Sequence, residues 1–292
     1  MAKRISAAHR GRLLALGSVA SFAVIPLLGR LSYDDGATPG MVILTRLLFG
    51  AIGAALAVWL LRRRWSIPRR DWLGTGIVCV AWIFVTVGYM ASYYYIPVSL
   101  AVLIFFTFPV LIALVGPLVA RQRPEPVTLS AALLAFVGLT LALGPDVGEL
   151  DWRGCALAFG AAVGGATTFL VSQRLIVEQD LFAFSFHLHL VCFLTVLLGY
   201  SVFGLPDVPV SIAGWVPLAG IAVFYAAAML MQFGAIRFAG PARASVVFNV
   251  EPVLTMLGAA LILGELLGAW QIGGAALVIA AVLLSTQARQ PA

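Results

Sequence analysis

The second half of this chain repeats the first half at a fixed offset of 143 residues. Pro252 corresponds to Pro109, and Trp215 corresponds to Trp72. The register holds without a gap when residues 12–138 are laid over residues 155–281. Each half contains five long apolar runs. An odd number of membrane crossings makes the second copy start from the opposite side, so the two halves must have inverted topology.

The apolar runs have the length of membrane-spanning helices. A helix rising about 1.5 Å per residue needs about 20 residues to cross a hydrocarbon core of about 30 Å. The runs cover residues 12–33, 38–61, 72–95, 98–120, 127–144, 154–174, 181–204, 212–236, 242–264 and 268–286. The short alternating segments of a membrane barrel are absent from the sequence. We therefore expect an all-α membrane protein with ten transmembrane helices.

Composition and charge exclude a soluble protein and indicate an orientation. With 62% hydrophobic and 10% charged residues, the chain could not cover a globular fold with a solvated polar surface. Lys and Arg gather in the segments that face one side, and the opposite side holds only Arg30 and Arg153. The asymmetry predicts that both termini are cytoplasmic. The net charge of +6 then faces anionic lipid headgroups of the bilayer, and no nucleic-acid partner is expected.

The connections between the apolar runs are too short to hold a soluble domain. We predict a single membrane domain over residues 1–292, with a first five-helix repeat at 12–144 and a second, inverted repeat at 154–286. The turn-rich residues 144–148 form the boundary. The first apolar run is too long for a signal peptide and is kept as the first helix. The three cysteines lack paired spacing, so we expect no disulfide framework, metal site or cofactor.

Two charged residues lie away from the ends of the predicted spans, Arg46 and Glu251. Glu251 is close to the middle of its helix and precedes Pro252, which removes a backbone hydrogen bond there. It acts either as a structural anchor or in the transport path. Arg46 lies nearer the outer end of its helix, where a tether between helices is favoured over a clamp for a substrate carboxylate. His189 is the repeat mate of Arg46.

The histidines on the seventh predicted helix form a pair at positions i and i+2. His187 and His189 therefore cannot share one face, and at most one points inward. A metal site needs more ligands than these. Ordinary hydrogen bonding between helices is favoured over a role in proton relay.

Aromatic and polar residues on the third and eighth predicted helices indicate a substrate pocket. Trp82, Thr86 and Tyr89 share one helical stripe, which continues to Tyr93. Tyr225 is the mate of Trp82, and Gln232 is the mate of Tyr89. Two aromatic walls could face each other across a symmetry axis. The alternative for Trp82 and Tyr225 is a packed core or a lipid-facing position.

A proline-broken aromatic segment occurs at matching positions in both repeats, at residues 105–109 and 248–252. Such broken helices are typical of the binding sites of secondary transporters, near the membrane midplane. The predicted substrate-binding residues are Trp82, Thr86, Tyr89, Phe105, Thr107, Tyr225, Gln232, Phe248 and Asn249.

Several features together resemble the EamA-type members of the drug/metabolite transporter superfamily, over nearly the whole chain. They are the inverted five-plus-five repeat, Glu251-Pro252, Gly264-Glu265 and the segment 270–274. Length and aromatic content look like bacterial amino acid exporters of the YddG type. The first repeat departs from the pattern, with Phe108 where the second has Glu251. A single acidic residue is left in the core.

The resemblance implies a secondary transporter, not an enzyme, that exports neutral or aromatic amino acids or related small metabolites. The zwitterion of an amino acid would be held by Asn249, Gln232 and Thr107. The protein would work in the inner membrane by alternating access as a monomer, with proton coupling through Glu251 and facilitated efflux both open. One alternative is a sugar-phosphate, nucleotide-sugar or drug transporter of the same fold, although sugar phosphates call for several cationic groups in the cavity. A scaffold or membrane enzyme is the alternative of another class.

Overall fold

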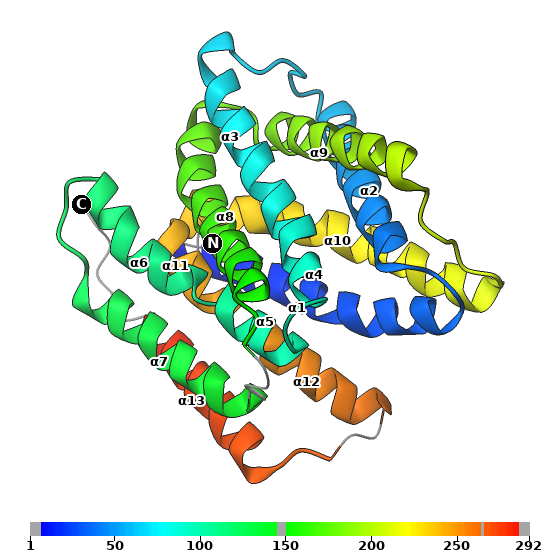
Figure 1. Cartoon of the computed structure of the whole chain (residues 1–292). Coiled ribbons are helices and arrows are strands. Elements are labelled where there is room, and N and C mark those ends of the chain that lie inside the picture. Colours follow the sequence, from blue (N-terminus) through cyan, green and yellow to red (C-terminus); the bar gives the residue numbers. More distant parts are fainter. Residues whose placement is uncertain (1–6, 145–149, 264–265, 286–292) are drawn as a thin grey trace, which may run out of the picture.

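A computed structural model describes residues 7–144, 150–263 and 266–285 of the chain (Figure 1). Every regular element in these ranges is helical, which confirms the all-α expectation. Nine helices or helix series in the described part are long and apolar enough to cross a membrane, and Ala269–Ser285 is a shorter apolar helix of 17 residues. Most of the expected boundary at 144–148 and the Gly264-Glu265 motif lie outside the described residues.

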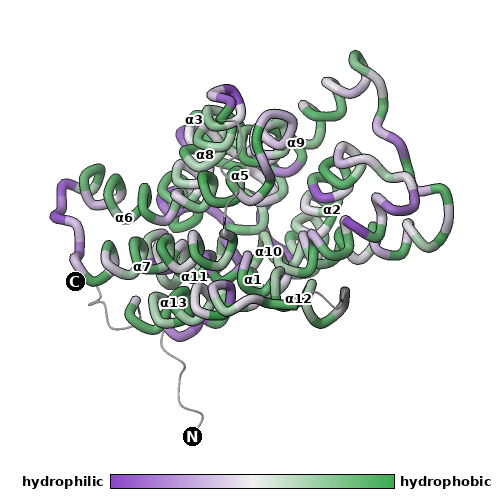
Figure 2. The backbone as a smooth tube through the Cα atoms, turned by 60° about the horizontal axis from the view of Figure 1, so that its bottom comes forward, coloured by the Kyte–Doolittle hydropathy of each residue, from purple (hydrophilic) through white to green (hydrophobic). Residues whose placement is uncertain are grey.

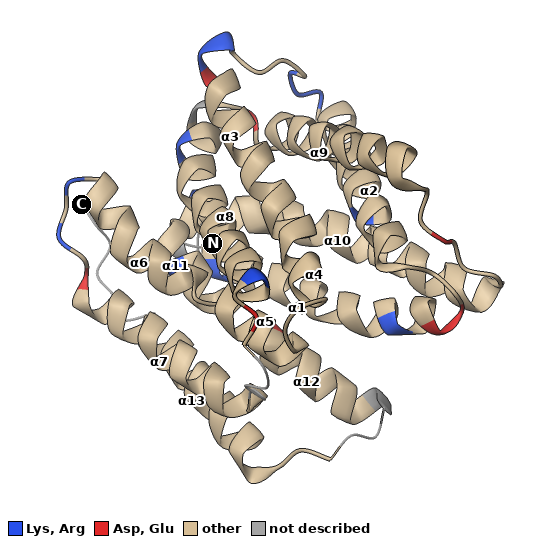
Figure 3. Ribbon diagram, viewed as in Figure 1, with Lys and Arg blue, Asp and Glu red and all other residues tan. Residues whose placement is uncertain are grey.

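The helices follow the repeat. The first half forms α1 (Ala7–Asp34), α2 (Pro39–Leu60), α3 (Trp72–Ile83), α4 (Tyr89–Ser92), α5 (Val98–Phe105), α6 (Phe108–Val119) and α7 (Pro126–Leu143). The second half forms α8 (Trp152–Glu178), α9 (Leu181–Phe203), α10 (Ile212–Ala239), α11 (Pro241–Phe248), α12 (Val250–Leu263) and α13 (Ala269–Ser285). Apolar residues run along the helices, and hydrophilic stretches lie mostly at helix ends and in loops (Figures 2 and 3).

The packing of the helices has the pattern that a two-fold axis produces. Helix α2 packs against its own mate α9, and α7 packs against its mate α13 (Figure 1). The other extensive contacts join helices that are not mates of each other: α1 lies along α10, and α3 lies along α8. The first helix of each repeat thus packs on the third helix of the other repeat. The two repeats are interlocked rather than side by side.

The fourth and ninth spans are each broken into two helices. Each apolar run, 98–120 and 242–264, was expected to contain a proline-broken segment, and α5 stops at Phe105 and α11 stops at Phe248. The backbone N–H of Thr107 bonds to Ile104 O, and that of Asn249 bonds to Val246 O, each at 3.2 Å. These three-residue turns occur just before the mated prolines, which cannot donate to the preceding turn.

The third span contains a π-helical turn, Phe84–Gly88, between α3 and α4. The span also ends at Ser92, so the expectation that it reached residue 95 is wrong. The N–H groups of Tyr93, Tyr94 and Tyr95 form turn hydrogen bonds instead. A π turn inserts extra backbone into the helix and re-aims the side chains that follow it, and such turns are frequent at functional sites.

Candidate functional site

A cavity of about 120 Å³ lies where the repeats meet. Its lining comes from near the middle of several spans in both repeats. The lining residues are Phe22, Arg46, Trp82, Val85, Thr86, Tyr89, Phe105, Phe108, Gly165, Phe169, Tyr225, Gln232, Phe248 and Glu251. Ten of them form five mate pairs at the 143-residue offset, so the cavity lies on the two-fold axis.

A hydrogen bond joins one of these mate pairs. The indole Nε1–H of Trp82 donates to the phenol oxygen of Tyr225 over 3.1 Å, and both side chains are buried. The bond gives each aromatic residue a partner for its polar tip, which a buried Trp or Tyr needs. The sequence left open whether these residues pack in the core, face lipid or line a pocket. Both line the cavity while being largely covered by neighbouring helices.

Arg46 and its repeat mate His189 both contact the ring of Tyr225. The Arg46 guanidinium carbon lies 5.5 Å from the centroid of the Tyr225 ring, within the range of a cation–π contact. The His189 ring stands edge-on to the same ring, with centroids 5.6 Å apart. His189 is fully buried, packs on Gly50 and has its Nδ1 2.7 Å from Ser185 O. Arg46 lines the cavity, and His189 supports the wall behind it.

Five aromatic rings form a continuous chain along one side of the cavity. The chain runs from Tyr89 through Phe105, Phe108 and Phe169 to Phe248, and successive centroids are 4.7, 5.3, 5.5 and 5.3 Å apart. The rings come from α4, α5, α6, α8 and α11. Offset and edge contacts of this kind each add about 0.5–1.5 kcal/mol beyond the area they bury. The wall can therefore stack on a flat apolar ligand.

Some predicted site residues lie elsewhere. The Thr107 hydroxyl donates to Ile104 O over 2.7 Å, and Asn249 is fully buried with Nδ2 donating to Val246 O over 3.2 Å. Neither lines the cavity. Both occupy the helix breaks, where each side chain bonds to its local turn, and Asn249 Oδ1 is buried without a hydrogen-bond partner in the described part. Tyr93 stacks edge-on to Tyr89 with centroids 5.1 Å apart but lies beyond the cavity.

His187 and His189 lie on different faces of α9, as their i, i+2 spacing predicts. His189 is buried beneath Tyr225, while His187 is half-buried and has its Nδ1 2.8 Å from Ala183 O. Neither lines the cavity. Within the ranges 7–144, 150–263 and 266–285, no three His, Cys, Asp or Glu side chains come together as metal ligands.

Five cavity residues were not among the predicted site residues: Phe22, Val85, Phe108, Gly165 and Phe169. Phe108 carries a signal that the repeat provides, because it is the mate of Glu251. Phe22 and Gly165 are mates of each other. Each of those mates lines the cavity as well. Phe169 has Pro26 as its mate, so symmetry gives no indication of its position.

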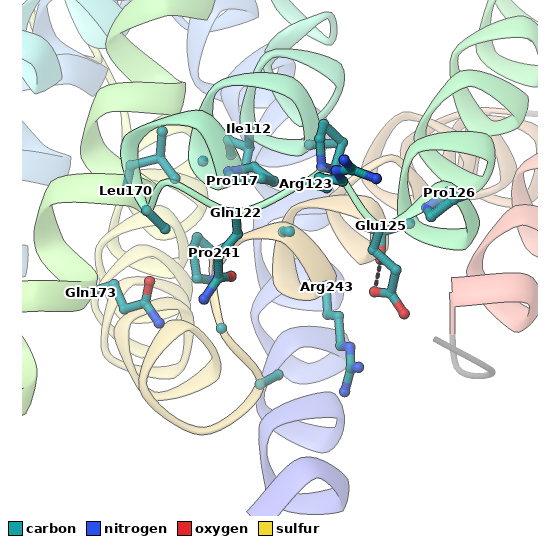
Figure 4. Close-up of a pocket in the computed structure, with 18 residues that line it drawn as sticks. Ile112, Pro117, Gln122, Arg123, Glu125, Pro126, Leu170, Gln173, Pro241 and Arg243 are labelled. Carbon is teal, nitrogen blue, oxygen red and sulfur yellow. Dashed lines mark hydrogen bonds between the residues drawn. The ribbon is translucent and has the colours of Figure 1, made fainter. Parts of the chain in front are cut away.

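A wider pocket of about 700 Å³, here called the vestibule, is lined by residues of α6, α7, α8, α10 and α11 and of the α6–α7 loop (Figure 4). It begins one helical turn beyond the aromatic chain. Ile112 follows Phe108 along α6, and Gln173 follows Phe169 along α8. The polar side chains of the vestibule include Gln122, Arg123, Glu125, Gln173 and Arg243. The Thr128 hydroxyl donates to Glu125 Oε2 over 2.7 Å. The vestibule lies on the side that carries the arginine-rich loops.

The opposite end is held together by contacts between the repeats. The Asp35 carboxylate accepts hydrogen bonds from the Ser211 N–H over 2.7 Å and from its hydroxyl over 2.8 Å. These bonds favour the charged form and lower the pKa of Asp35. Deeper in the span, the Thr255 hydroxyl donates to Ala23 O over 3.3 Å and joins α12 to α1.

Comparison with known proteins agrees with this arrangement. The sequence profile of the EamA-like transporter family matches residues 9–144 and matches again at residues 152–287. A crystal structure of a protein that is 16% identical aligns with a TM-score of 0.82 over 95% of this chain and 96% of the other. That likeness shows the fold. No curated protein matches the sequence.

Proposed function

This chain belongs to the EamA-like transporter family, and from that premise we propose that it exports neutral or aromatic amino acids or related small metabolites by alternating access. The observation that carries the proposal is the cavity lined by five mate pairs. A site built from equivalent residues of two inverted repeats can be reached from either side when the repeats exchange conformations.

The moving parts are the two repeats, residues 12–144 and 154–286. The breaks at Thr107 and Asn249 lie beside the cavity and supply turns in which helices α5 and α6, or α11 and α12, change angle. The vestibule gives substrate access from the side that we assign to the cytoplasm. The hydrogen bonds of Asp35 to Ser211 then belong to the outer gate, which must open for release.

The lining supports a small substrate with an apolar body. Its volume of about 120 Å³ is below the roughly 300–1,000 Å³ of pockets for drug-sized ligands, so an aromatic side chain enters as the rings rearrange. One arginine and one glutamate line the cavity. A sugar phosphate would meet a carboxylate and a single cation, which disfavours that alternative.

We place the protein in the inner membrane as a multi-pass monomer with cytoplasmic termini. The arginines of the α2–α3 and α6–α7 loops support this orientation, since positive loops remain inside. The chain carries its whole cavity by itself, so one copy supplies a complete site.

A counterflow assay on purified protein in liposomes tests the proposal. Vesicles preloaded with one unlabelled amino acid should accumulate the same labelled amino acid, and neutral aromatic members of the panel should give the highest signal. Protein-free vesicles are the control. Export in cells is measured by loading them with a phenylalanine-containing dipeptide and following amino acid release. Counterflow of sugar phosphates with none of amino acids would overturn the proposal.

A further inference from the structure

Two opposite charges lie well inside the membrane spans and line the same cavity. Arg46 comes from α2 of the first repeat, and Glu251 comes from α12 of the second. Glu251 is at the middle of its span and Arg46 lies seven residues after the start of its own, and at both places a charged group is costly unless it has a partner or water. The cavity therefore has one cationic and one anionic pole.

The two poles do not neutralise each other directly. Throughout the described part of the chain, no carboxylate lies within 4.0 Å of the Arg46 guanidinium, whose central carbon lies 5.5 Å from the centroid of the Tyr225 ring. The Nε of Arg46 is buried without a hydrogen-bond partner. A structural tether would satisfy this donor, because leaving a buried charged donor unpaired costs at least about 1–3 kcal/mol.

A third polar residue of the cavity, Gln232, also has a buried donor without a hydrogen-bond partner. The side-chain Nε2 of Gln232 is buried, lines the cavity region and has no hydrogen-bond partner in the described part. Its N–H groups are donors, as are those of Arg46. Donors without acceptors and a carboxylate within one lining are complementary to a ligand that carries both an anionic and a cationic group.

We propose that Arg46 and Glu251 bind the two ends of a zwitterionic α-amino acid. Arg46 takes the carboxylate in its planar fork with Gln232 as a second donor, and Glu251 takes the ammonium. The rings around them hold the side chain. The inference rests on the proposed function and deepens it, because it replaces Thr107 and Asn249 as zwitterion ligands and assigns Arg46 a role beyond a tether.

The two-pole site makes a distinct prediction for substrate analogues. Phenethylamine lacks the carboxylate of phenylalanine, and 3-phenylpropionate lacks its ammonium. Each analogue leaves one pole unpaired, so each should compete with labelled phenylalanine at least about tenfold more weakly than unlabelled phenylalanine does. Competition is measured in the counterflow assay with wild-type protein.

Variants that remove one charge should each lose the preference for phenylalanine over one of the two analogues and keep the preference over the other. Arg46→Gln should abolish the preference for phenylalanine over phenethylamine while the preference over 3-phenylpropionate persists. Glu251→Gln should do the reverse. Arg46→Lys keeps the pole and should retain part of the preference. Thr195→Val is the control, because its hydroxyl bonds to Val191 O at an exposed position of α9 outside the cavity lining, and it should change neither preference.

The outcomes separate this inference from the proposed function. If no amino acid gives counterflow, the proposed function fails. If phenylalanine is transported but both analogues compete equally well, the function stands and the two-pole site is wrong. If a variant does not fold, the wild-type analogue series still decides. Equal weakening of all three ligands by Arg46→Gln would also overturn the inference, because a structural tether predicts that result.

Discussion

The hydrogen bond between Trp82 and Tyr225 joins two residues that occupy the same position in the two repeats. They are 143 residues apart, and 3.1 Å separates the indole nitrogen from the phenol oxygen. Two equivalent residues can touch only where the symmetry axis passes between them. The bond therefore marks the centre of the molecule, around which the two repeats must move if access to the cavity alternates.

Substitutions in this pair should lower transport more than they lower the amount of folded protein. We expect Trp82→Ala and Tyr225→Ala to reduce flux strongly, because stacking worth about 0.5–1.5 kcal/mol beyond burial is lost on each side. Tyr225→Phe keeps the ring and removes only the hydrogen bond, so its loss should be smaller. Flux is measured by counterflow and normalised to monodisperse protein. Trp59→Ala is the control, since Trp59 is 67% exposed on α2. Normal flux in both alanine variants would move the substrate site away from this pair.

Glu251 distinguishes proton-coupled export from facilitated efflux. If the carboxylate changes protonation during the cycle, Glu251→Gln should lose the stimulation of net flux by an imposed pH gradient, because an amide does not titrate. The measured quantity is the gradient-driven flux divided by the same variant's counterflow at saturating substrate. This ratio corrects for weaker binding of the ammonium.

Two results would contradict a coupling role for Glu251. Wild-type flux that ignores the gradient excludes coupling altogether and leaves Glu251 as a substrate ligand. A variant that still responds to the gradient moves the proton site elsewhere, with His189 and His187 as the next groups to test. His189 lies behind the Tyr225 ring, whereas His187 lies on another face of α9.

The contact between α7 and α13 should be sensitive to a single methyl group. A Cβ at Gly274 would collide with the backbone at Gly138 O and Ala142 N, whereas a Cβ at Gly273 would meet nothing within 4 Å. We expect Gly274→Ala to lower the melting temperature in detergent by several degrees, in line with the roughly 1–3 kcal/mol cost of overpacking. Gly273→Ala is the neighbouring control and should melt like the wild type. Equal melting of the two variants would show that the helices do not approach this closely.

The charge asymmetry predicts the orientation in the membrane. A reporter fused after Ala292 should read cytoplasmic, and a reporter inserted between Gly144 and Arg153 should read external, because an odd number of crossings separates them. Activity of a phosphatase reporter, which folds outside, and fluorescence of a reporter that folds inside give the two readings. The reverse pattern would invert the assignment of the vestibule to the cytoplasmic side.

The architecture can be derived from the sequence alone, because the signals that define it are one-dimensional. The length of each apolar run decides whether it spans the bilayer, and the 143-residue offset shows which helices are equivalent. Proline at positions 109 and 252 indicated both helix breaks, since a missing N–H acts locally. The pairing of Trp82 with Tyr225 followed from the same offset, although the offset could not show that the two side chains touch.

Which face of each helix points to the two-fold axis between the repeats is visible only in the folded structure. Thr107 bonds to its own turn, and Arg46, expected as a tether, lines the cavity with an unpaired Nε. The π turn near Thr86 and the position of Phe169 left no trace in the hydrophobic pattern. In a membrane, both the lipid-facing and the buried faces of a helix are apolar. Helix rotation is therefore set by close packing with neighbours, through contacts such as Gly274 on Gly138, and hydropathy carries little information about it.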